Sequence, residues 1–331
     1  MKTAVIIPNW NGADFLAESI DSLLAQTVTC TVIVVDNGSK DQSIEILEAY
    51  GDKVTILRNE KNLGFSGGVN TGIRYALKND YDAVALLNND AVADRKWLEY
   101  LSHELRGTTG IVTSLILSAD GSRIDTTGES LSVWGLAFPR GRGKEASTSP
   151  LQNSFVFGAS GGASLYSVPM LKEIGLFDED FFAYYEDIDL SFRAQLTGWK
   201  VIFVPTAMVR HKIGATSGKV RGLTTYHTFK NMRLLIIKNT PDSLKRTVYP
   251  RFYLAYSLFQ LRALLTRNVL YMVQGSIHGI VLTPKKIREG KLIRQTQSVS
   301  DNYIAALLTP DLPERSNIRK LRSLWWKLIG R

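Results

Sequence analysis

The sequence has one cysteine and no long hydrophobic run. Cys30 lies inside an apolar stretch, so the chain can have neither a disulfide framework nor a cysteine-based zinc site. Apolar runs of about 18 or more residues are absent, and we therefore expect no transmembrane helix. The first residues, Met1 to Pro8, are typical of a strand, so we expect no cleavable signal peptide.

Acidic residues are scarce in the last third of the chain. Residues 1–211 contain 18 Lys/Arg and 26 Asp/Glu, a balance of −8, whereas residues 212–331 contain 22 and 5, a balance of +17. This change predicts a module boundary near residues 212–245, which we place between residues 223 and 224. A basic module can bind nucleic acid, an anionic membrane surface or an acidic ligand.

The glycine fingerprint of dinucleotide-binding domains is also missing. Strands are predicted at Ala4–Pro8, Thr31–Val35 and Val54–Leu57, with helices at Phe15–Gln26 and at residues 39–50. This βαβαβ order has the spacing of a nucleotide-binding half in an α/β fold. Because no Gly-x-Gly-x-x-Gly follows the first strand, a dinucleotide Rossmann domain is disfavoured.

A fourth predicted strand, residues 81–87, ends abruptly in Asn88, Asn89 and Asp90. Its uninterrupted apolar residues suit a strand buried on both faces of a parallel sheet. Ligands of such sheets bind beyond the carboxyl ends of the strands, where an Asp carboxylate suits a hard cation such as Mg²⁺ or Mn²⁺. The alternative is an ordinary turn rich in Asn and Asp.

Two other segments carry polar groups to the same edge. Asp36 and Asn37 follow the second strand and could hydrogen-bond a base or a ribose, or could instead cap a helix. The glycine-rich segment 62–68 leads into a predicted helix, Val69–Leu77, whose first N–H groups favour anions. A loop that needs only flexibility would have the same composition.

Four motifs in this order resemble the family 2 glycosyltransferases with the GT-A fold, in the branch of the rhamnosyltransferases. The resemblance runs from residue 1 to about residue 240. It implies a mixed, mostly parallel sheet sandwiched by helices, with a nucleotide-binding half (1–105) and an acceptor-binding half (106–223), followed by a basic helical extension (224–331). The motifs are Ile6 to Gly12, Val34 to Ser39, Asn62 to Asn70 and Leu87 to Asp90.

The resemblance also implies a nucleotide-diphospho-sugar donor and a divalent metal, Mn²⁺ or Mg²⁺. Asp90 would be the metal carboxylate of the family's Asp-x-Asp signature, whose first position is Asn88 here, which lowers the charge of the site. The residues implied to bind the donor are Pro8, Asn9, Asn11, Asp36, Asn37, Asn62, Gly64, Phe65, Gly68, Asn70, Asn88 and Asn89.

A second acidic segment follows four aromatic residues. Glu186, Asp187 and Asp189 fall in the first turn of a predicted helix, where the helix dipole favours acids in general. The segment resembles the family's Glu-Asp motif, which makes Asp187 the general base for an acceptor hydroxyl. We expect Glu186 and Asp189 to position the helix or the acceptor.

His211 comes shortly after a predicted strand, Lys200–Pro205. A lone His at such a place is more often structural, because imidazole has many polar uses. It stands 24 residues after Asp187, as the metal-binding His does in related family members, so the resemblance makes His211 the second metal ligand. Imidazole suits Mn²⁺ better than Mg²⁺.

Two small-residue segments remain in this half. Phe157–Leu165 is predicted to be a strand that a ligand can approach closely, with Gly161 and Gly162 on the acceptor side. Arg140–Lys144 is a basic, glycine-rich run that we expect to be a solvated loop; the alternative is contact with a diphosphate.

The basic extension is expected to be helical, with a helix over residues 224–239 and an interrupted apolar stretch at 251–273. Ile318, Leu321, Trp325 and Leu328 share one helical face flanked by Lys and Arg, which favours an anionic membrane surface. The alternative is packing on its own domain or in a homodimer. No nucleic-acid-binding motif accompanies the charge, so we expect no nucleic-acid partner.

These features predict an inverting, metal-dependent glycosyltransferase, because a single base without a second nucleophile suits inversion. From the resemblance we expect transfer of rhamnose from dTDP-rhamnose to a saccharide or polyprenyl-diphosphate-linked acceptor in bacterial polysaccharide assembly. We expect a cytoplasmic protein, peripheral on the inner face of the membrane. The alternatives are a UDP-sugar donor, such as UDP-galactofuranose or UDP-glucose, and a non-catalytic nucleotide-sugar-binding or membrane-scaffold protein.

Overall fold

The computed structural model describes residues 1–146, 151–212 and 220–310. Its first half is a parallel sheet with the strand order β3-β2-β1-β4. This order belongs to nucleotide-binding α/β halves, and it brings the carboxyl ends of the four strands to one edge. The strands are β1 (Thr3–Asn9), β2 (Thr31–Asp36), β3 (Thr55–Arg58) and β4 (Ala83–Leu87).

The second half continues the sheet from β4. Strand β11 (Ala163–Ser167) runs antiparallel between β4 and β6 (Thr109–Ser118), and β12 (Lys200–His211) lies parallel to β6. The mixed, mostly parallel α/β sheet that the sequence predicts is therefore confirmed. Shorter strands pair at its margins: β5 (Ala91–Ala93), β7 (Ile124–Thr126) and β10 (Ser154–Phe155).

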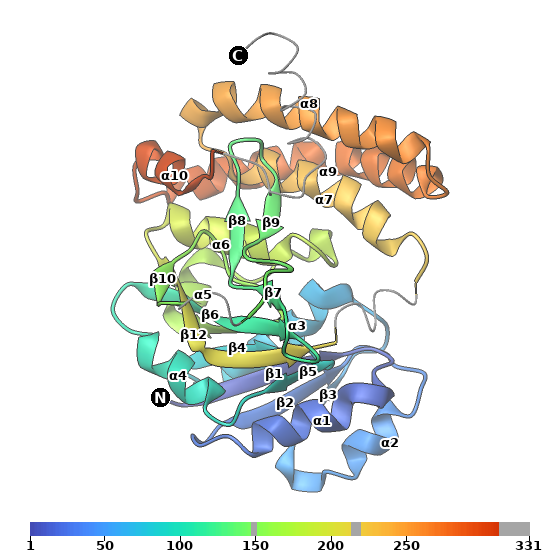
Figure 1. The fold of residues 1–331 in the computed structure, drawn as a ribbon, viewed down its shortest axis with the longest axis vertical. Helices are drawn as coiled ribbons and strands as arrows, with labels where there is room; N and C mark the ends of the chain where they lie inside the picture. Colours follow the sequence, from blue (N-terminus) through green and yellow to red (C-terminus); the bar gives the residue numbers. More distant parts are fainter. Residues whose placement is uncertain (147–150, 213–219, 311–331) are drawn as a thin grey trace.

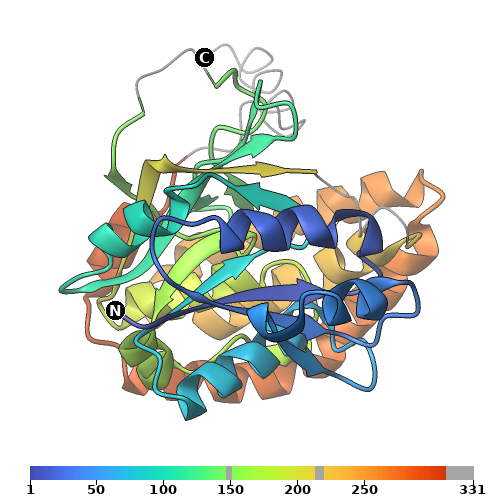
Figure 2. The same ribbon diagram turned by 90° about the horizontal axis from the view of Figure 1, so that it is seen from below.

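Helices cover both faces of the sheet (Figure 2). In β1 the side chains alternate: Val5 and Ile7 pack toward α1, whereas Ala4 and Ile6 pack toward α3. Two buried faces explain why the strands are apolar throughout. One layer holds α1 (Ala13–Leu24), α2 (Ser43–Glu48) and α4 (Trp97–Glu104), and the other holds α3 (Gly64–Lys78), α5 (Val168–Ile174) and α6 (Glu186–Leu196).

The basic helices form a further layer beyond α6, at the end of the molecule opposite α1 and α2 (Figure 1). Their core is shared with the acceptor half, since Phe181 and Phe192 pack in one cluster with Leu235 and Phe252. The change of composition at residue 223 is thus not a break in packing. The elements are α7 (Leu223–Asn239), α8 (Lys245–Leu264), α9 (Val269–Gln295) and α10 (Asp301–Leu307), joined in the cluster by the hairpin of β8 (Glu129–Leu131) and β9 (Ala137–Pro139).

Several predicted elements have different bounds. Helix α3 begins at Gly64 rather than Val69, so the glycine-rich segment is its first turn and packs closely on the sheet. Of the predicted strand Phe157–Leu165, only residues 163–165 are in a strand, β11. Residues 157–162 are irregular: Gly158 forms a single bridge to Glu129, and the N–H groups of Ala159 and Gly161 donate to side chains of α6. Helix α2 is shorter than predicted, and β12 extends beyond Pro205 through an irregular stretch at Val204–Met208.

The predicted amphipathic face at residues 318–328 lies outside the described residues. Of the described helices, none combines the length and the apolar character that crossing a bilayer requires, as expected. Short 3₁₀ helices complete the elements: η1 (Gly51–Lys53), η2 (Glu179–Phe181) and η4 (Asp242–Leu244).

Candidate active site

Hydrogen bonds join the ends of three parallel strands. Asn89, after β4, donates to Oδ1 of Asn9 at the end of β1 over 2.7 Å, and Asn9 donates to Oδ1 of Asp36 at the end of β2 over 3.4 Å. All three side chains are buried. These predicted donor residues are therefore brought together, and they form the floor of the edge where a ligand of this fold binds.

Asp36 and Asn37 hold two loops in place. Asp36 accepts a hydrogen bond from the Ser39 N–H, in the manner of a turn-stabilising Asp. The Asn37 amide donates to the Gly64 carbonyl over 2.9 Å and accepts from Leu63 N–H over 3.1 Å. The two sequence interpretations, ligand contact and local capping, are thus not exclusive, because the side chains fix the loops that border the site.

Other predicted donor residues border the same edge. Asn62 accepts from the Gly64 N–H, and Asn11 accepts from the Lys40 N–H with its own backbone in the left-handed region. Gly68 is required by close packing, since a Cβ there would lie 3.0 Å from Nδ2 of Asn37 and 3.7 Å from Cβ of Pro8. These residues shape the loops around the predicted donor site.

Asn70 has a different environment. It is buried in α3, where its amide donates to the Phe177 carbonyl over 2.8 Å and accepts from the Phe177 N–H over 3.1 Å. It also donates to Glu179 over 2.9 Å. These contacts occupy the amide, so Asn70 joins α3 to the segment before η2 and acts on the site through that segment.

The two predicted metal ligands meet at one point. Oδ1 of Asp90 lies 3.1 Å from Nε2 of His211, and Nδ2 of Asn88 lies 3.4 Å from the same nitrogen. The pairing of β12 with β5 produces this approach, because it sets His211 opposite Ala91. Asp90 is nearly buried and His211 is partly exposed. A carboxylate and an imidazole that converge in this way suit Mn²⁺.

Sequence reasoning missed the groups that orient His211. Oδ2 of Asp125, in β7, lies 3.0 Å from Nδ1 of His211, and Arg142 donates to the other oxygen of Asp125 over 2.7 Å. Segment 140–144 was expected to be a solvated loop, but its Arg142 side chain holds Asp125 in place beside His211. A second partner of this kind fixes which imidazole nitrogen faces the metal. Asp125 could not be recognised from the sequence, because an Asp in a strand of three residues looks the same as an Asp in a turn.

The charges around His211 are strongly coupled. Burial opposes protonation of the imidazole, but its hydrogen bonds to the Asp125 and Asp90 carboxylates outweigh this effect and raise the pKa of His211 to about 9. Burial likewise opposes ionisation of Asp125, yet His211 and Arg142 hold its pKa below the usual value. Asp90 and Asp125 therefore favour a positive charge on His211 itself. Because only the neutral imidazole ligates a metal, a cation bound by Asp90 and His211 would have to displace this proton.

Asp187 is the half-buried carboxylate of the second site. Its Oδ2 accepts from the Gly161 N–H over 3.0 Å and its Oδ1 from the Ile188 N–H over 2.8 Å. Burial raises the pKa of Asp187, and the two N–H groups limit the rise. A general base works best with a pKa near the working pH, so a raised value suits the predicted role.

The neighbours of Asp187 differ in kind. Glu186 is buried, and burial together with the Asp187 carboxylate raises its pKa well above the usual value. Glu129 of β8, which sequence reasoning missed, has its pKa raised by the same two causes. Asp187 differs from both in that two N–H groups donate to its carboxylate and counter the effect of burial.

Asp189 does not face the acceptor side. It is fully buried, with Arg193 and Lys238 each 2.9 Å from its Oδ2 and Asn239 donating to Oδ1 over 2.8 Å. Of the two roles expected, positioning the helix fits these contacts and positioning the acceptor does not. Asp189 secures α6, and with it Asp187, against α7.

The segment before Asp187 has an uncommon backbone. Phe182, Tyr184 and Tyr185 all have positive φ values, 66°, 69° and 72°, which side-chain-bearing residues seldom adopt. Asn231 of α7 holds this segment, since its Nδ2 lies within 2.9 Å of the carbonyls of Phe181, Ala183 and Tyr184. A residue of the basic extension therefore holds the segment that precedes Asp187, the predicted general base.

Replacing Asn231 with alanine is expected to lower kcat about tenfold or more, with little change in nucleotide affinity, because a misplacement of the base by about 1 Å is costly. Steady-state kinetics and nucleotide titration would measure the two effects. Asn239→Ala is the control on the same helix: it should lower stability by a similar amount, because it also leaves a buried partner unpaired, but should affect kcat less. Equal kcat losses in both variants would show that Asn231 has no special part in positioning.

A cluster of three carboxylates, Asp178, Asp180 and Glu289, resembles a metal site by distance alone. The Lys286 ammonium already occupies its centre: it pairs with Asp178, and its Nζ lies 2.7 Å from both Asp180 and Glu289. Lys286 is fully buried and the acids raise its pKa despite that burial. This cluster is an ion pair network that joins α9 to η2, and it needs no metal.

Glycines connect the two chemical centres. The Asn88 N–H donates to the Gly162 carbonyl over 2.9 Å, and the N–H of the preceding residue, Gly161, donates to Asp187. A Cβ on Gly161 would lie 3.0 Å from the ring of Phe65 and 3.5 Å from Cβ of Asp187. Gly161 and Gly162 therefore connect the backbone of Asn88, the Phe65 ring and the predicted general base Asp187.

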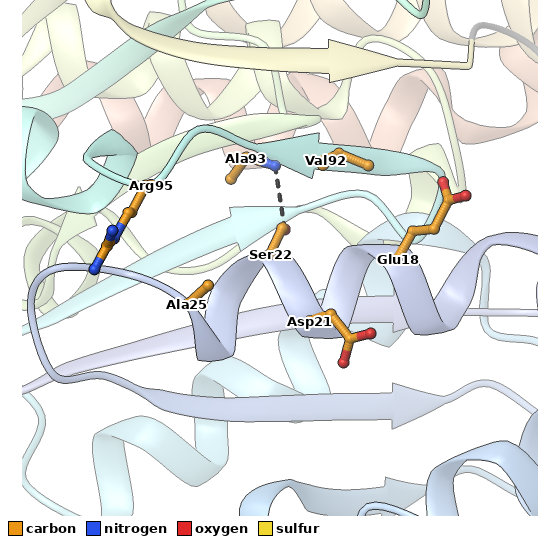
Figure 3. Close-up of a pocket in the computed structure, with 7 residues that line it drawn as sticks. All are labelled: Glu18, Asp21, Ser22, Ala25, Val92, Ala93 and Arg95. Carbon is orange, nitrogen blue, oxygen red and sulfur yellow. Dashed lines mark hydrogen bonds between the residues drawn. The ribbon is translucent and has the colours of Figure 1, made fainter.

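A hollow lies beside α1 and is lined by other residues. It has a volume of about 450 Å³ and lies between α1 and β5, where Ser22 accepts from the Ala93 N–H over 3.2 Å (Figure 3). Its charged side chains, Glu18, Asp21 and Arg95, do not converge on one point in the close-up. It contains none of the predicted site residues.

The family model for glycosyl transferase family 2 matches residues 4–175, just over half of the chain. The chain belongs to glycosyl transferase family 2. An uncharacterized glycosyltransferase of Rickettsia typhi is 30% identical over 195 residues, which are 57% of each protein. The chain thus spans little more than half the length of that relative.

Two further similarities extend over more of the chain. The low-salt glycan biosynthesis hexosyltransferase Agl10 of Haloferax volcanii is 26% identical over 262 residues, covering 75% of this chain and 82% of the relative. The crystal structure of GalNAc-T7 with UDP, GalNAc and Mn²⁺ superposes with a TM-score of 0.60 at 17% identity, covering 87% of this chain and 56% of that one. The latter similarity establishes the GT-A-like fold alone.

Proposed function

We propose that this protein is an inverting glycosyltransferase that depends on a divalent metal and takes a nucleotide-diphospho-sugar as donor. Family membership supports the donor class. The single observation that carries the proposal is the convergence of Asp90 and His211 on one point. Gly161 and Gly162 connect Asp187 to the backbone of Asn88, two residues before Asp90. The similarity to the Haloferax hexosyltransferase Agl10 supports this class.

The residues present fit a metal. Asp90 and His211 offer one oxygen and one nitrogen on the same side, and Asp125 and Arg142 fix the imidazole from behind. Two protein ligands leave positions for diphosphate oxygens and water, as Mg²⁺ and Mn²⁺ sites in phosphate-using enzymes do. When bound, the metal would supply positive charge against the diphosphate leaving group.

The protein groups then have distinct tasks. Asp187 would accept the proton of an acceptor hydroxyl, and the Gly161 and Ile188 N–H groups orient its carboxylate for that step. Glu186 and Glu129 have raised pKa values, which makes them poor nucleophiles at neutral pH. A single ionised base supports direct displacement with inversion, because retention by a double displacement needs a second, ionised carboxylate as nucleophile.

The donor we propose is dTDP-rhamnose, on the motif resemblance of residues 6–12, 34–39, 62–70 and 87–90. We propose that the acceptor is a saccharide or a polyprenyl-diphosphate-linked saccharide in bacterial polysaccharide assembly at the cytoplasmic face of the membrane. The strongly basic last third of the chain supports an acceptor held at an anionic surface. A UDP-sugar donor is the second candidate, which the UDP in the GalNAc-T7 structure favours.

A screen of nucleotide sugars tests the donor. Melting temperatures with Mn²⁺ present should rise most with dTDP-rhamnose, and chelation of the metal should remove most of the rise, because stabilisation follows ligand affinity. A rise with UDP-galactofuranose or UDP-glucose alone would establish the second candidate. Binding without donor hydrolysis or transfer to any acceptor would instead support a nucleotide-sugar-binding protein.

A further inference from the structure

The turn between α8 and α9 exposes large apolar side chains. We call residues 261–270 the hairpin tip. Its leucines are Leu261, Leu264, Leu265 and Leu270, with exposed fractions of 59%, 54%, 90% and 61%. The exposed apolar residues continue along α9 through Ile277 and Val281, whereas the opposite face of this helix packs on α7. Such a run of exposed apolar residues marks an interaction surface.

The charge around this surface has one sign. Between Asp242 and Glu289 there is no acidic residue, whereas the same segment holds eight cations. Arg262 and Arg267 belong to the hairpin tip, and among the described residues no ion pair is recorded for either. A second copy of the chain would place these cations against one another, so a homodimer through this surface is disfavoured.

A groove behind the hairpin tip leads toward the general base. It has a volume of about 410 Å³, and its walls come from β9, α7 and the tip, including Phe138, Met232 and Arg262. Tyr185, two residues before Asp187, is among its lining residues, and burial followed by the Glu129 and Asp187 carboxylates raises the pKa of this Tyr. The groove thus joins the exposed apolar tip to the acceptor side of the site.

We propose that the hairpin tip docks on a bilayer that contains anionic phospholipid. Its leucines enter the boundary between headgroups and acyl chains, and Arg262 and Arg267 pair with lipid phosphates. The groove then opens at the membrane surface, so that an acceptor held there reaches Asp187 from the membrane side. This last part rests on the proposed function, whereas the docking itself does not.

The test uses co-sedimentation of the full chain with phosphatidylcholine vesicles, with and without phosphatidylglycerol. The double substitution Leu264→Glu and Leu265→Glu should weaken binding to anionic vesicles about a hundredfold, since each leucine contributes roughly a factor of ten. Leu24→Glu is the matched control, because Leu24 is 41% exposed at the C-terminal end of α1, on the opposite end of the molecule (Figure 1). Leu24→Glu should bind as the parent chain does.

Three results would overturn the proposal. The double variant could bind as the parent chain does, which would transfer docking to another segment such as residues 311–331. The parent chain could show no preference for phosphatidylglycerol. It could also elute as a dimer that the double variant converts to monomer, with no vesicle binding. Docking as expected with no sugar transfer to any acceptor would contradict the proposed function and leave the docking surface standing.

Discussion

Replacing Asp187 with asparagine is expected to lower kcat by about 10²–10⁴-fold, because an amide cannot take the acceptor proton. The fold should persist, since the Gly161 and Ile188 N–H groups can still donate to the amide oxygen. Donor affinity should stay near the parent value, because within the described part of the chain Asp187 forms no hydrogen bond or ion pair with Asp90 or His211. Transfer assays and nucleotide titration would measure the two quantities.

Asp120→Asn is the control for this variant. Asp120 lies in the exposed turn between β6 and β7, where its contacts are with Ser118 and Ser122. Its replacement should leave kcat unchanged. Transfer at the parent rate by Asp187→Asn would show that the base lies elsewhere, whereas equal loss of kcat in both variants would indicate a general sensitivity of the chain.

Replacing Lys286 with methionine is expected to cost about 3–5 kcal/mol of stability. The change leaves Asp178, Asp180 and Glu289 facing one another without the buried ammonium, and a buried charge without its partner is strongly destabilising. Lys238, 2.6 Å from Asp178, would compensate in part. Denaturation midpoints of the parent and variant chains would measure the loss.

Lys285→Met is the matched control. Lys285 is half exposed and lies 2.6 Å from Asp180, so its loss should cost at most about 1 kcal/mol. Equal losses in both variants would mean that the Lys286 network contributes no more than a surface pair.

The same network predicts acid sensitivity. Burial opposes ionisation of Asp178, but Lys238 and Lys286 lower its pKa below the value in the unfolded chain. Its contribution to stability is thus complete above the unfolded value of about 3.9 and decreases as the pH falls below it. In Lys286→Met this dependence on acid pH should be smaller, because one of the two cations that lower the pKa is gone.

The ends of the strands could be predicted from the sequence, but the side chains that hold them in place could not. Apolar runs that stop at Asn9, Asp36 and Asn88 were readable because a strand buried on both faces admits few polar residues. Their convergence then followed from the shared edge of a parallel sheet. His211 was accessible through its spacing from Asp187 in a known family, and the pairing of β12 with β5 supplies the physical reason for its place.

Contacts between distant segments that support the site could not be predicted from the sequence. Asp125 meets His211 from 86 residues away, and Asn231 meets the segment before Asp187 from almost 50. Neither lies in a periodic pattern or a recognisable motif, since a buried Asp or Asn is determined by its partner rather than by its neighbours in sequence. The basic composition of residues 224–331 suggested a separate module. Composition alone does not reveal that Lys238 and Lys286 are buried and pair with Asp178 of the acceptor half.

The metal site permits the most direct test of this account. Calorimetric titration of a nucleoside diphosphate in the presence of Mn²⁺ should show binding that chelation abolishes. Asp90→Asn and His211→Ala should each lose this metal-dependent binding, and Asp125→Asn should weaken it about 10–100-fold, because the imidazole would lose its fixed orientation. Metal-dependent binding of parent strength in both Asp90→Asn and His211→Ala would contradict the account.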